Sequence, residues 1–155
     1  MARDKQSNQR MTSFDTNLLF FAYAADRPEH TRAKAFLDTY SEERNVLLSE
    51  FVLVELYRLL RNSAVLRAPL NAKQAAEVVQ TWRNHPLWVI SGLSSESNLL
   101  HDRLWRISSQ PGFAARRIFD ARLALVLLQQ GVSEFATANV KDFEGFGFKR
   151  VWNPL

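Results

Sequence analysis

The sequence places an acidic residue at or near the end of several apolar runs that have the composition of core segments. These acids come from four separate parts of the chain: Asp15, Glu55, Asp120 and Asp142. Ionised carboxylates that lie together away from water repel one another and lose hydration, so they need a compensating charge. A divalent cation supplies that charge, and oxygen-only ligands favour Mg²⁺ or Mn²⁺ over zinc. The pattern therefore predicts a magnesium or manganese site.

The chemistry that such a site supports is phosphodiester hydrolysis. A cation held by carboxylates binds a phosphate oxygen, lowers the pKa of a bound water and offsets charge on the leaving oxygen. The net charge of +4, from 20 Lys and Arg against 16 Asp and Glu, is compatible with a polyanionic partner such as RNA. Many basic proteins bind no nucleic acid, so charge alone does not select this function.

The composition bounds the class of protein. With 155 residues, 46% of them hydrophobic, the chain can form one domain with a sizeable core. The absence of cysteine excludes disulfides, thiolate nucleophiles and Cys-type zinc sites. No apolar run approaches the roughly 18 residues of a membrane span, and residues 1–10 are polar rather than signal-like. We expect a cytoplasmic protein without membrane association, with a mobile basic arm over residues 1–10 and a single domain over 11–155.

Short strands alternate with helices along the chain. The predicted strands lie at residues 12–14, 45–48, 87–90, 134–137 and 150–152. The predicted helices lie at residues 18–25, 28–40, 50–61, 71–82, 95–109 and 116–130, with a short turn or helix at 142–146. Residues with capping chemistry, Asn17, Ser49 and Asn71, precede three of these helices, and Gly131 ends another. The alternation favours an α/β fold with a largely parallel sheet.

In an open parallel sheet, ligands bind beyond the carboxyl ends of the strands. Asp15 directly follows the first predicted strand, and Thr137 and Asn139 directly follow a late one, so we expect all three at one edge. Glu55 lies in the middle of the helix after the second strand. Asp120 lies in the first turn of the apolar helix at 116–130, where the positive end of the helix dipole favours a carboxylate.

Four motifs, taken in order and spacing, resemble those of PIN-domain proteins, and within that family a VapC-type toxin ribonuclease of a toxin–antitoxin pair. They are Phe14-Asp15-Thr16-Asn17-Leu18-Leu19, the segment Leu48 to Leu56, Phe119-Asp120-Ala121-Arg122-Leu123-Ala124, and Gly131 followed by Thr137 to Phe143. The similarity covers about residues 11–153. It implies a PIN-like three-layer α/β/α fold with a central, mostly parallel sheet, and a Mg²⁺-dependent endoribonuclease.

The resemblance also implies residue roles. Asp15, Glu55 and Asp120 match the three acidic metal-site positions of the family, whereas Glu50 has the place of a charge in the first helical turn. The fourth position stays open. Many relatives carry an acid where this chain has Asn139, and the nearest acid here is Asp142. Residues of the type found at Thr16, Asn17 and Thr137 hold the carboxylates or orient water in the family.

The implied partners are an RNA substrate, a cognate antitoxin protein and a second copy of the chain. The antitoxin is expected to cover the helices around residues 18–60 and to block the metal site. The homodimer is expected to form through apolar and aromatic residues of the later helices, including Trp105. Two other functions stay open: a catalytically silent PIN-like module that binds RNA or protein, and a metal-dependent DNase or flap nuclease. The lack of an added DNA-binding segment counts against the DNase or flap-nuclease function.

Simpler interpretations exist for individual residues. Asp15 could be a turn residue at the end of a strand, with no ligand. Asp142 could be the cap of the short segment that contains Phe143. Asp120 has the position of a charge at a helix N-terminus with no ligand. Arg116, Arg117 and Arg122 flank it, which suggests phosphate binding, but their spacing places at least one of them away from its face of the helix.

Overall fold

The computed structural model describes residues 10–155, so nearly all of the predicted arm lies outside the described residues. The strands are β1 (Met11–Phe14), β2 (Leu47–Ser49), β3 (Val89–Ser91), β4 (Val132–Ala136) and β5 (Arg150–Trp152). The helices are α1 (Thr16–Tyr23), α2 (His30–Asp38), α3 (Glu50–Leu60), α4 (Ala72–Arg83), α5 (Ser97–Ser108), α6 (Ile118–Gln129) and α7 (Val140–Phe143), with a 3-10 turn η1 (Ala115–Arg117) before α6. All the strands and helices predicted from the sequence are present, with ends shifted by a few residues.

The strands form a parallel sheet in the order β3-β2-β1-β4-β5. The ladders β1-β4-β5 and β2-β3 are each parallel throughout. A parallel bridge between Thr12 and Val46, with the Thr12 amide donating to the Asn45 carbonyl oxygen at 2.8 Å, joins the two parts. The register of β1 against β4 pairs Phe14 with Ala136, so the residues that follow both strands leave the sheet side by side.

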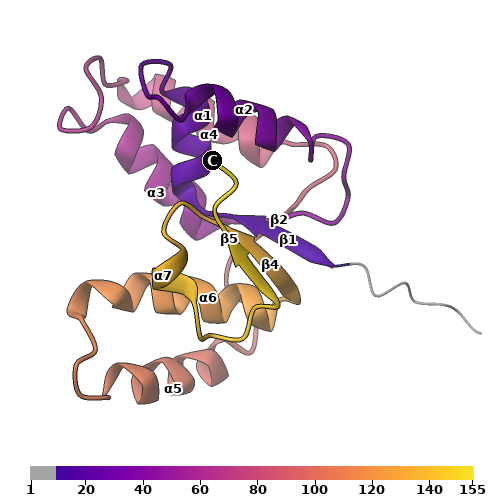
Figure 1. Cartoon of the computed structure of the whole chain (residues 1–155), viewed down its shortest axis with the longest axis vertical. Coiled ribbons are helices and arrows are strands. Elements are labelled where there is room, and N and C mark those ends of the chain that lie inside the picture. The colour runs from indigo at the N-terminus through magenta and orange to yellow at the C-terminus, as the bar shows by residue number, and fades with distance from the viewer. Residues whose placement is uncertain (1–9) are drawn as a thin grey trace, which may run out of the picture.

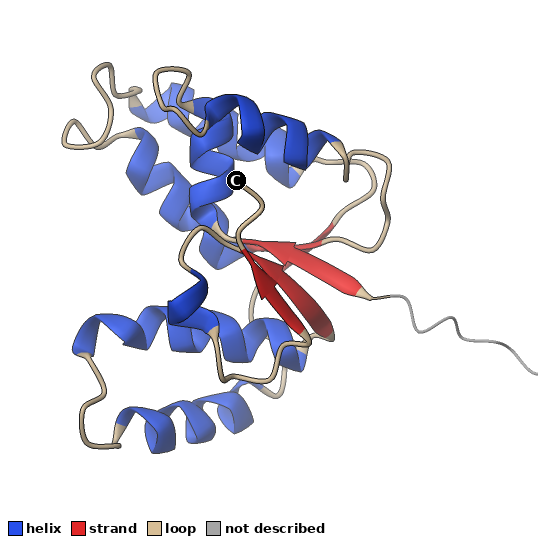
Figure 2. Cartoon of the chain, viewed as in Figure 1, coloured by secondary structure: helices blue, strands red, loops and turns tan. Residues whose placement is uncertain are grey.

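Helices cover both faces of this sheet. Helices α1 to α4 lie on one side and α5, α6 and α7 on the other, with the strands between them (Figures 1 and 2). The predicted three-layer α/β/α fold is therefore confirmed. Within residues 10–155, no helix is both long and apolar enough to cross a membrane.

Aromatic packing on one side and an apolar helix on the other form the core. The fully buried Phe14 ring meets the rings of Phe36, Tyr40 and Trp88 edge to face. Helix α6 buries Ala121 and the whole run 123–127, as its apolar sequence predicts. Burial of this helix fixes the place of the polar residues in its first turn.

The helix caps agree with the sequence at two of three positions. Ser49 Oγ accepts a hydrogen bond from the amide of Phe51 at 3.1 Å, and Asn71 forms a reciprocal capping box with Gln74. The prediction that Asn17 caps the first helix is wrong. That helix begins two residues earlier than predicted, at Thr16, and Asp15 is its N-cap, with a side chain that accepts from the Thr16 amide. The strand-end acid therefore also begins the helix.

Gly131 makes the sharp turn from α6 into β4. Its φ of +88° lies in the left-handed region, which disfavours residues with a Cβ atom. A Cβ added at Gly131 would meet no atom within 4 Å, so any penalty at this position comes from the backbone alone.

We predict that Gly131→Ala lowers the free energy of unfolding by about 1 kcal/mol, since alanine resists a left-handed φ. For a chain of this size that corresponds to a Tm lower by about 2–4 °C in a thermal melt. Gly131→Asn is the matched control, because asparagine tolerates this conformation better. A Tm for the Ala variant equal to or above that of the Asn variant would contradict the explanation.

Candidate active site

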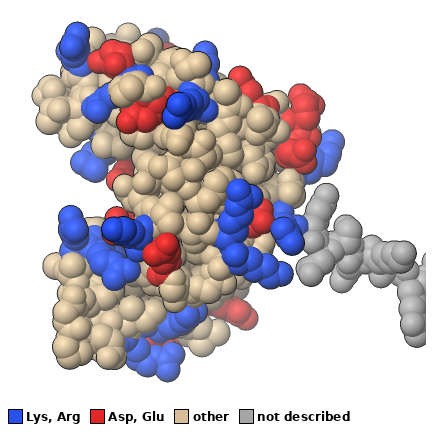
Figure 3. All heavy atoms as spheres, in the orientation of Figure 1, with Lys and Arg blue, Asp and Glu red and all other residues tan. Residues whose placement is uncertain are grey.

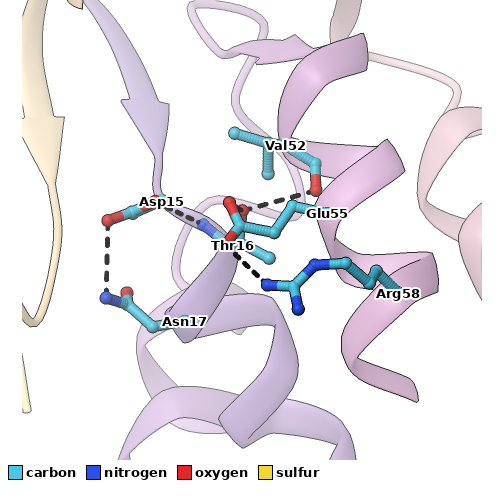
Figure 4. A network of polar contacts seen from close by, with 6 residues as sticks. All are labelled: Asp15, Thr16, Asn17, Val52, Glu55 and Arg58. Carbon is cyan, nitrogen blue, oxygen red and sulfur yellow. Dashed lines mark hydrogen bonds and ion pairs between the residues drawn. The ribbon is translucent and has the colours of Figure 1, made fainter. Parts of the chain in front are cut away.

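The Asp15 carboxylate is a buried group with fixed orientation at the carboxyl end of β1. Thr137 Oγ1 donates to Asp15 Oδ2 at 2.6 Å, and the backbone amide of Thr16 donates to Oδ1 at 2.8 Å. Asn17 Nδ2 donates to Oδ2 at 3.4 Å (Figure 4). Both carboxylate oxygens are therefore held before any ligand binds.

The same contacts tie the loop after β4 to the start of α1. Thr137 Oγ1 accepts a hydrogen bond from the amide of Asn139 at 3.0 Å while it donates to Asp15. Asn17 Oδ1 accepts from the amide of Ala138 at 3.3 Å. Thr137 and Asn17 thus hold Asp15 and position the loop that carries Asn139.

Helix α3 brings Glu55 to this group. Thr16 Oγ1 lies 3.3 Å from Glu55 Oε2 and 3.4 Å from the Val52 carbonyl oxygen, and Arg58 Nη2 lies 3.7 Å from Glu55 Oε1 (Figure 4). The apolar neighbours of Glu55 in the sequence suggest a buried side chain, but this side chain is 50% exposed. The apolar neighbours mostly face the core, whereas Glu55 and the 68% exposed Val54 face outward.

The negative charges of neighbouring acids act on Asp15 and Asp120. Burial, chiefly, raises the pKa of Asp15 to about 7, and the negative charges of Glu55 and Asp120 add to this effect against the opposing hydrogen bonds. Burial also raises the pKa of Asp120 to about 6, together with the charges of Asp142 and Glu55. The positive charge of Arg117 acts in the opposite direction and lowers the pKa of Asp120. Asp120 is in the first turn of α6, as predicted. The helix dipole is only one influence on this carboxylate, because burial and the neighbouring charges also act on it.

The two candidates for the fourth position both lie near the other acids. Asn139 is exposed and lines the same cleft as Asp120, and its side chain makes no capping bond to α7. Asp142 lies within the first turn of α7, and its charge contributes to the raised pKa of Asp120. The interpretation of Asp142 as a helix cap is therefore wrong, because α7 begins at Val140 and Asn139 has the cap position.

Glu50 lies apart from the other acids, as the motif spacing predicts. It is in the first turn of α3, and its Oε1 accepts from Arg83 Nε of α4 at 2.8 Å. Its partner is thus a neighbouring helix. Glu50 does not line the cleft that contains Glu55 and Asp120.

A cleft of about 640 Å³ between α3 and α6 exposes the site. Figure 3 shows a hollow on the left edge of the molecule, with acidic groups in it and basic groups beside it. The cleft is lined by Phe51, Val54, Glu55, Arg58, Arg116, Phe119, Asp120, Arg122, Leu123 and Asn139. Sequence reasoning missed Phe51, Arg58 and Phe119 as members of this surface. The spacing of Glu55 and Arg58, one turn apart, was the available signal for Arg58.

The donor atoms fit a divalent cation. Carboxylate, hydroxyl and amide oxygens are the ligands that Mg²⁺ and Mn²⁺ prefer. Within residues 10–155, no three Asp, Glu or His side chains are close enough to form a complete metal cluster as they stand. Asp15 and Asp120 nevertheless feel the negative charge of neighbouring acids, which a cation would offset. Asp15 is buried and held in place, whereas the Glu55 side chain is half exposed.

The fold and this group of residues define a class of protein. The PIN domain family model matches residues 13–148, a range that includes Asp15, Glu55, Asp120 and Asp142. The chain belongs to the PIN-domain family, and the resemblance of its motifs is confirmed.

Particular members of the family are similar over most of the chain. Ribonuclease VapC24 of Mycobacterium tuberculosis is 46% identical over 145 residues, which cover 94% of this chain and 97% of that protein. The crystal structure of VapBC2 from Rickettsia felis, bound to a DNA fragment from their promoter, matches with a TM-score of 0.66 at 15% identity and covers 92% of this chain and 98% of that chain. The structure of VapC20 of Mycobacterium tuberculosis, a Sarcin-Ricin loop cleaving toxin, matches with a TM-score of 0.60 at 19% identity, over 80% and 86% of the two chains.

The raised pKa of Asp15 predicts how stability depends on pH without metal. Between its ordinary value of 3.8 and about 7, the folded chain holds a proton that the unfolded chain has lost. The contribution of Asp15 to the free energy of unfolding therefore falls as the pH rises through that window. Asp15→Asn removes the effect, so in EDTA we expect its Tm to exceed that of the parent by ~5 °C at pH 8 and by clearly less at pH 5.

Thermal melts of both proteins at the two pH values check this expectation. Asp26→Asn is the matched control, because Asp26 is an exposed acid in the turn between α1 and α2. A gain for Asp15→Asn that is the same at pH 5 and pH 8 would show that burial of charge is not its cause.

Proposed function

We propose that this chain is a Mg²⁺-dependent endoribonuclease and the toxin of a type II toxin–antitoxin pair. The observation that carries the proposal is that Glu55 and Asp120 line an open cleft and that their negative charges help to raise the pKa of the buried Asp15, which Thr137 holds in place. Similarity to Ribonuclease VapC24 over nearly the whole chain supports RNA as the substrate. The cytoplasm, where such a target lies, is the proposed location.

Within this proposal, the acids would hold Mg²⁺ or Mn²⁺, which supplies charge neutralisation and activation of water when bound. Asp15 is the fixed ligand, since Thr137 and the Thr16 amide hold its oxygens. Its raised pKa means that it loses a proton on binding a cation near neutral pH. Thr16 positions Glu55 through its hydroxyl group. The cleft leaves room for a nucleic-acid backbone beside these groups.

Arginines on the cleft supply the contacts for that backbone. Arg58 from α3, Arg116 from η1 and Arg122 from α6 line the cleft around the acids. Guanidinium groups bind phosphate oxygens in paired hydrogen bonds, so they suit the phosphates on either side of the one that is cut. Cleavage is then hydrolysis of the P–O bond by water.

The proposed protein partners are an antitoxin and a second copy of the chain. The VapBC2 structure supports an antitoxin partner. Helix α3 carries Glu55 next to the exposed Val54, so a partner that covers α1 to α4 would also cover the site. For the homodimer, α5 presents Leu99 and Trp105, which are 57% and 61% exposed.

A second candidate function is a catalytically silent module that binds RNA. Asn139 favours it, because an amide stands on the cleft where many relatives of the family carry an acid. Loss of one carboxylate weakens the attraction for a second cation. The two functions differ in whether RNA is cut.

Incubation of the purified chain with total RNA, with and without EDTA, separates the two functions. We expect discrete cuts, which mapping of the new ends locates, that disappear with EDTA and return with excess Mg²⁺. Binding of RNA without any cut would support the silent module instead.

We predict that Asp15→Asn, Asp120→Asn and Glu55→Gln each reduce Mg²⁺-dependent cleavage at least ~100-fold, because each removes ligand charge with little change in volume. Glu50→Gln is the matched control, since Glu50 pairs with Arg83 outside the cleft, and we expect nearly parental rates. Initial rates on one RNA with a mapped cut site provide the measurement. An essential Glu50 with a dispensable Glu55 would contradict the assignment of α3.

The fourth position has its own test, a titration of cleavage rate against Mg²⁺ concentration. If Asp142 supports the cation, Asp142→Asn raises the concentration for half activity by about 10-fold or more. Asn139→Asp adds a carboxylate on the cleft and should lower that concentration. An Asp142→Asn curve identical to the parent would leave a site of three carboxylates.

A further inference from the structure

Phe119 is a large aromatic residue in an unusual place. It directly precedes Asp120 on α6 and lines the cleft, yet its side chain is 71% exposed, the largest fraction among the exposed large apolar residues of the described chain. A single exposed apolar residue needs no explanation by itself. Its position beside the acid at the start of α6 is what calls for one.

The surroundings of Phe119 are basic. Arg122, one turn further along α6, stacks its guanidinium group 4.3 Å from the centroid of the Phe51 ring of α3. Arg116 lies one turn before Phe119. Within residues 10–155, neither of these arginines forms an ion pair. Both therefore keep their N–H donors for an anion that enters the cleft, and the Phe51 ring already holds Arg122 flat.

The cleft thus offers separate groups for each part of a nucleotide. The acids and their cation would take one phosphate, and the arginines would take the neighbouring phosphates. The exposed ring of Phe119 lines the same cleft, directly before Asp120 on α6. An unpaired base can splay out and stack on an aromatic ring, and such stacking is a common means of binding single strands.

We propose that Phe119 is a base-stacking residue that positions the cut. The unpaired nucleotide next to the scissile phosphate stacks on the Phe119 ring, and Arg122 holds an adjacent phosphate. This inference rests on the proposed nuclease function, because only a nuclease has a scissile phosphate. The stacking contact itself is a binding property and is measured separately. The mixture of aromatic and basic groups beside the acids favours RNA over a protein partner as the occupant of this ring.

The first test measures RNA binding where cleavage is suppressed. In a Glu55→Gln background with Mg²⁺ present, we expect Phe119→Leu to weaken the Kd for a single-stranded RNA about 10-fold. Phe119→Tyr keeps the ring and should stay within about 2-fold of the background. Leucine keeps most of the apolar surface, so a protein interface would tolerate it better than a stacked base. Thermal melts confirm that the variants fold, as the exposure of the side chain predicts.

The second test asks whether Phe119 contacts the base of one particular nucleotide. An RNA without the base next to the mapped cut should bind the Glu55→Gln protein about 10-fold more weakly, while Phe119→Leu in that background should lose nothing further from this abasic RNA. In the otherwise parental chain, Phe119→Leu should raise KM for the intact RNA with a smaller change in kcat.

Each outcome is decisive. Equal RNA affinity for the Leu and Tyr variants would overturn the stacking role, and so would additive losses from the Leu variant and the abasic RNA. Weakened self-association or antitoxin binding with unchanged RNA affinity would make Phe119 a protein contact and also overturn it. If the parental chain cuts no RNA but the Leu variant still loses affinity, the stacking contact stands and the nuclease function fails.

Discussion

One hydrogen bond between the residues that follow two neighbouring parallel strands, from Thr137 Oγ1 to Asp15 Oδ2, holds the buried carboxylate around which the candidate site is built. The bond exists because β1 and β4 end at the same level, with Phe14 beside Ala136. Burial strongly disfavours the ionised form of Asp15, and its neighbours' charges disfavour it further. The fold tolerates this group because the donors around it are already in place, and a cation would remove the remaining repulsion.

The helices deliver the other acids at different depths. Asp15 is almost fully buried, Asp120 is intermediate, and Glu55 is half exposed. This gradient has a chemical consequence. Asp15 is the most deeply buried of these acids, its hydrogen bonds fix its orientation, and its raised pKa means that a cation bound there near neutral pH would displace a proton. One fixed carboxylate beside more exposed ones would suit a site that binds a cation and a phosphate together.

The sequence predicts much of this arrangement, and the failures have a common cause. Strand-end placement puts Asp15 and Thr137 at one edge, and side-chain chemistry identifies Ser49 and Asn71 as caps. The local pattern favours Asn17 as the cap of α1, because it does not reveal that the strand-end acid also begins the helix. The exposure of Glu55 and the cleft-lining position of Phe119 depend on how α3 faces α6. That packing brings together residues far apart in the chain, and the local periodicity of the sequence does not predict it.

The central claim is that these acids form one cation site built on Asp15. Diffraction from crystals soaked in Mn²⁺, measured at its absorption edge, tests this claim without reference to activity. We expect an anomalous peak in contact with an oxygen of Asp15 and with carboxylates of Glu55 or Asp120. A peak at full Mn²⁺ occupancy elsewhere, with Asp15 still bound only by Thr137, Thr16 and Asn17, would contradict it.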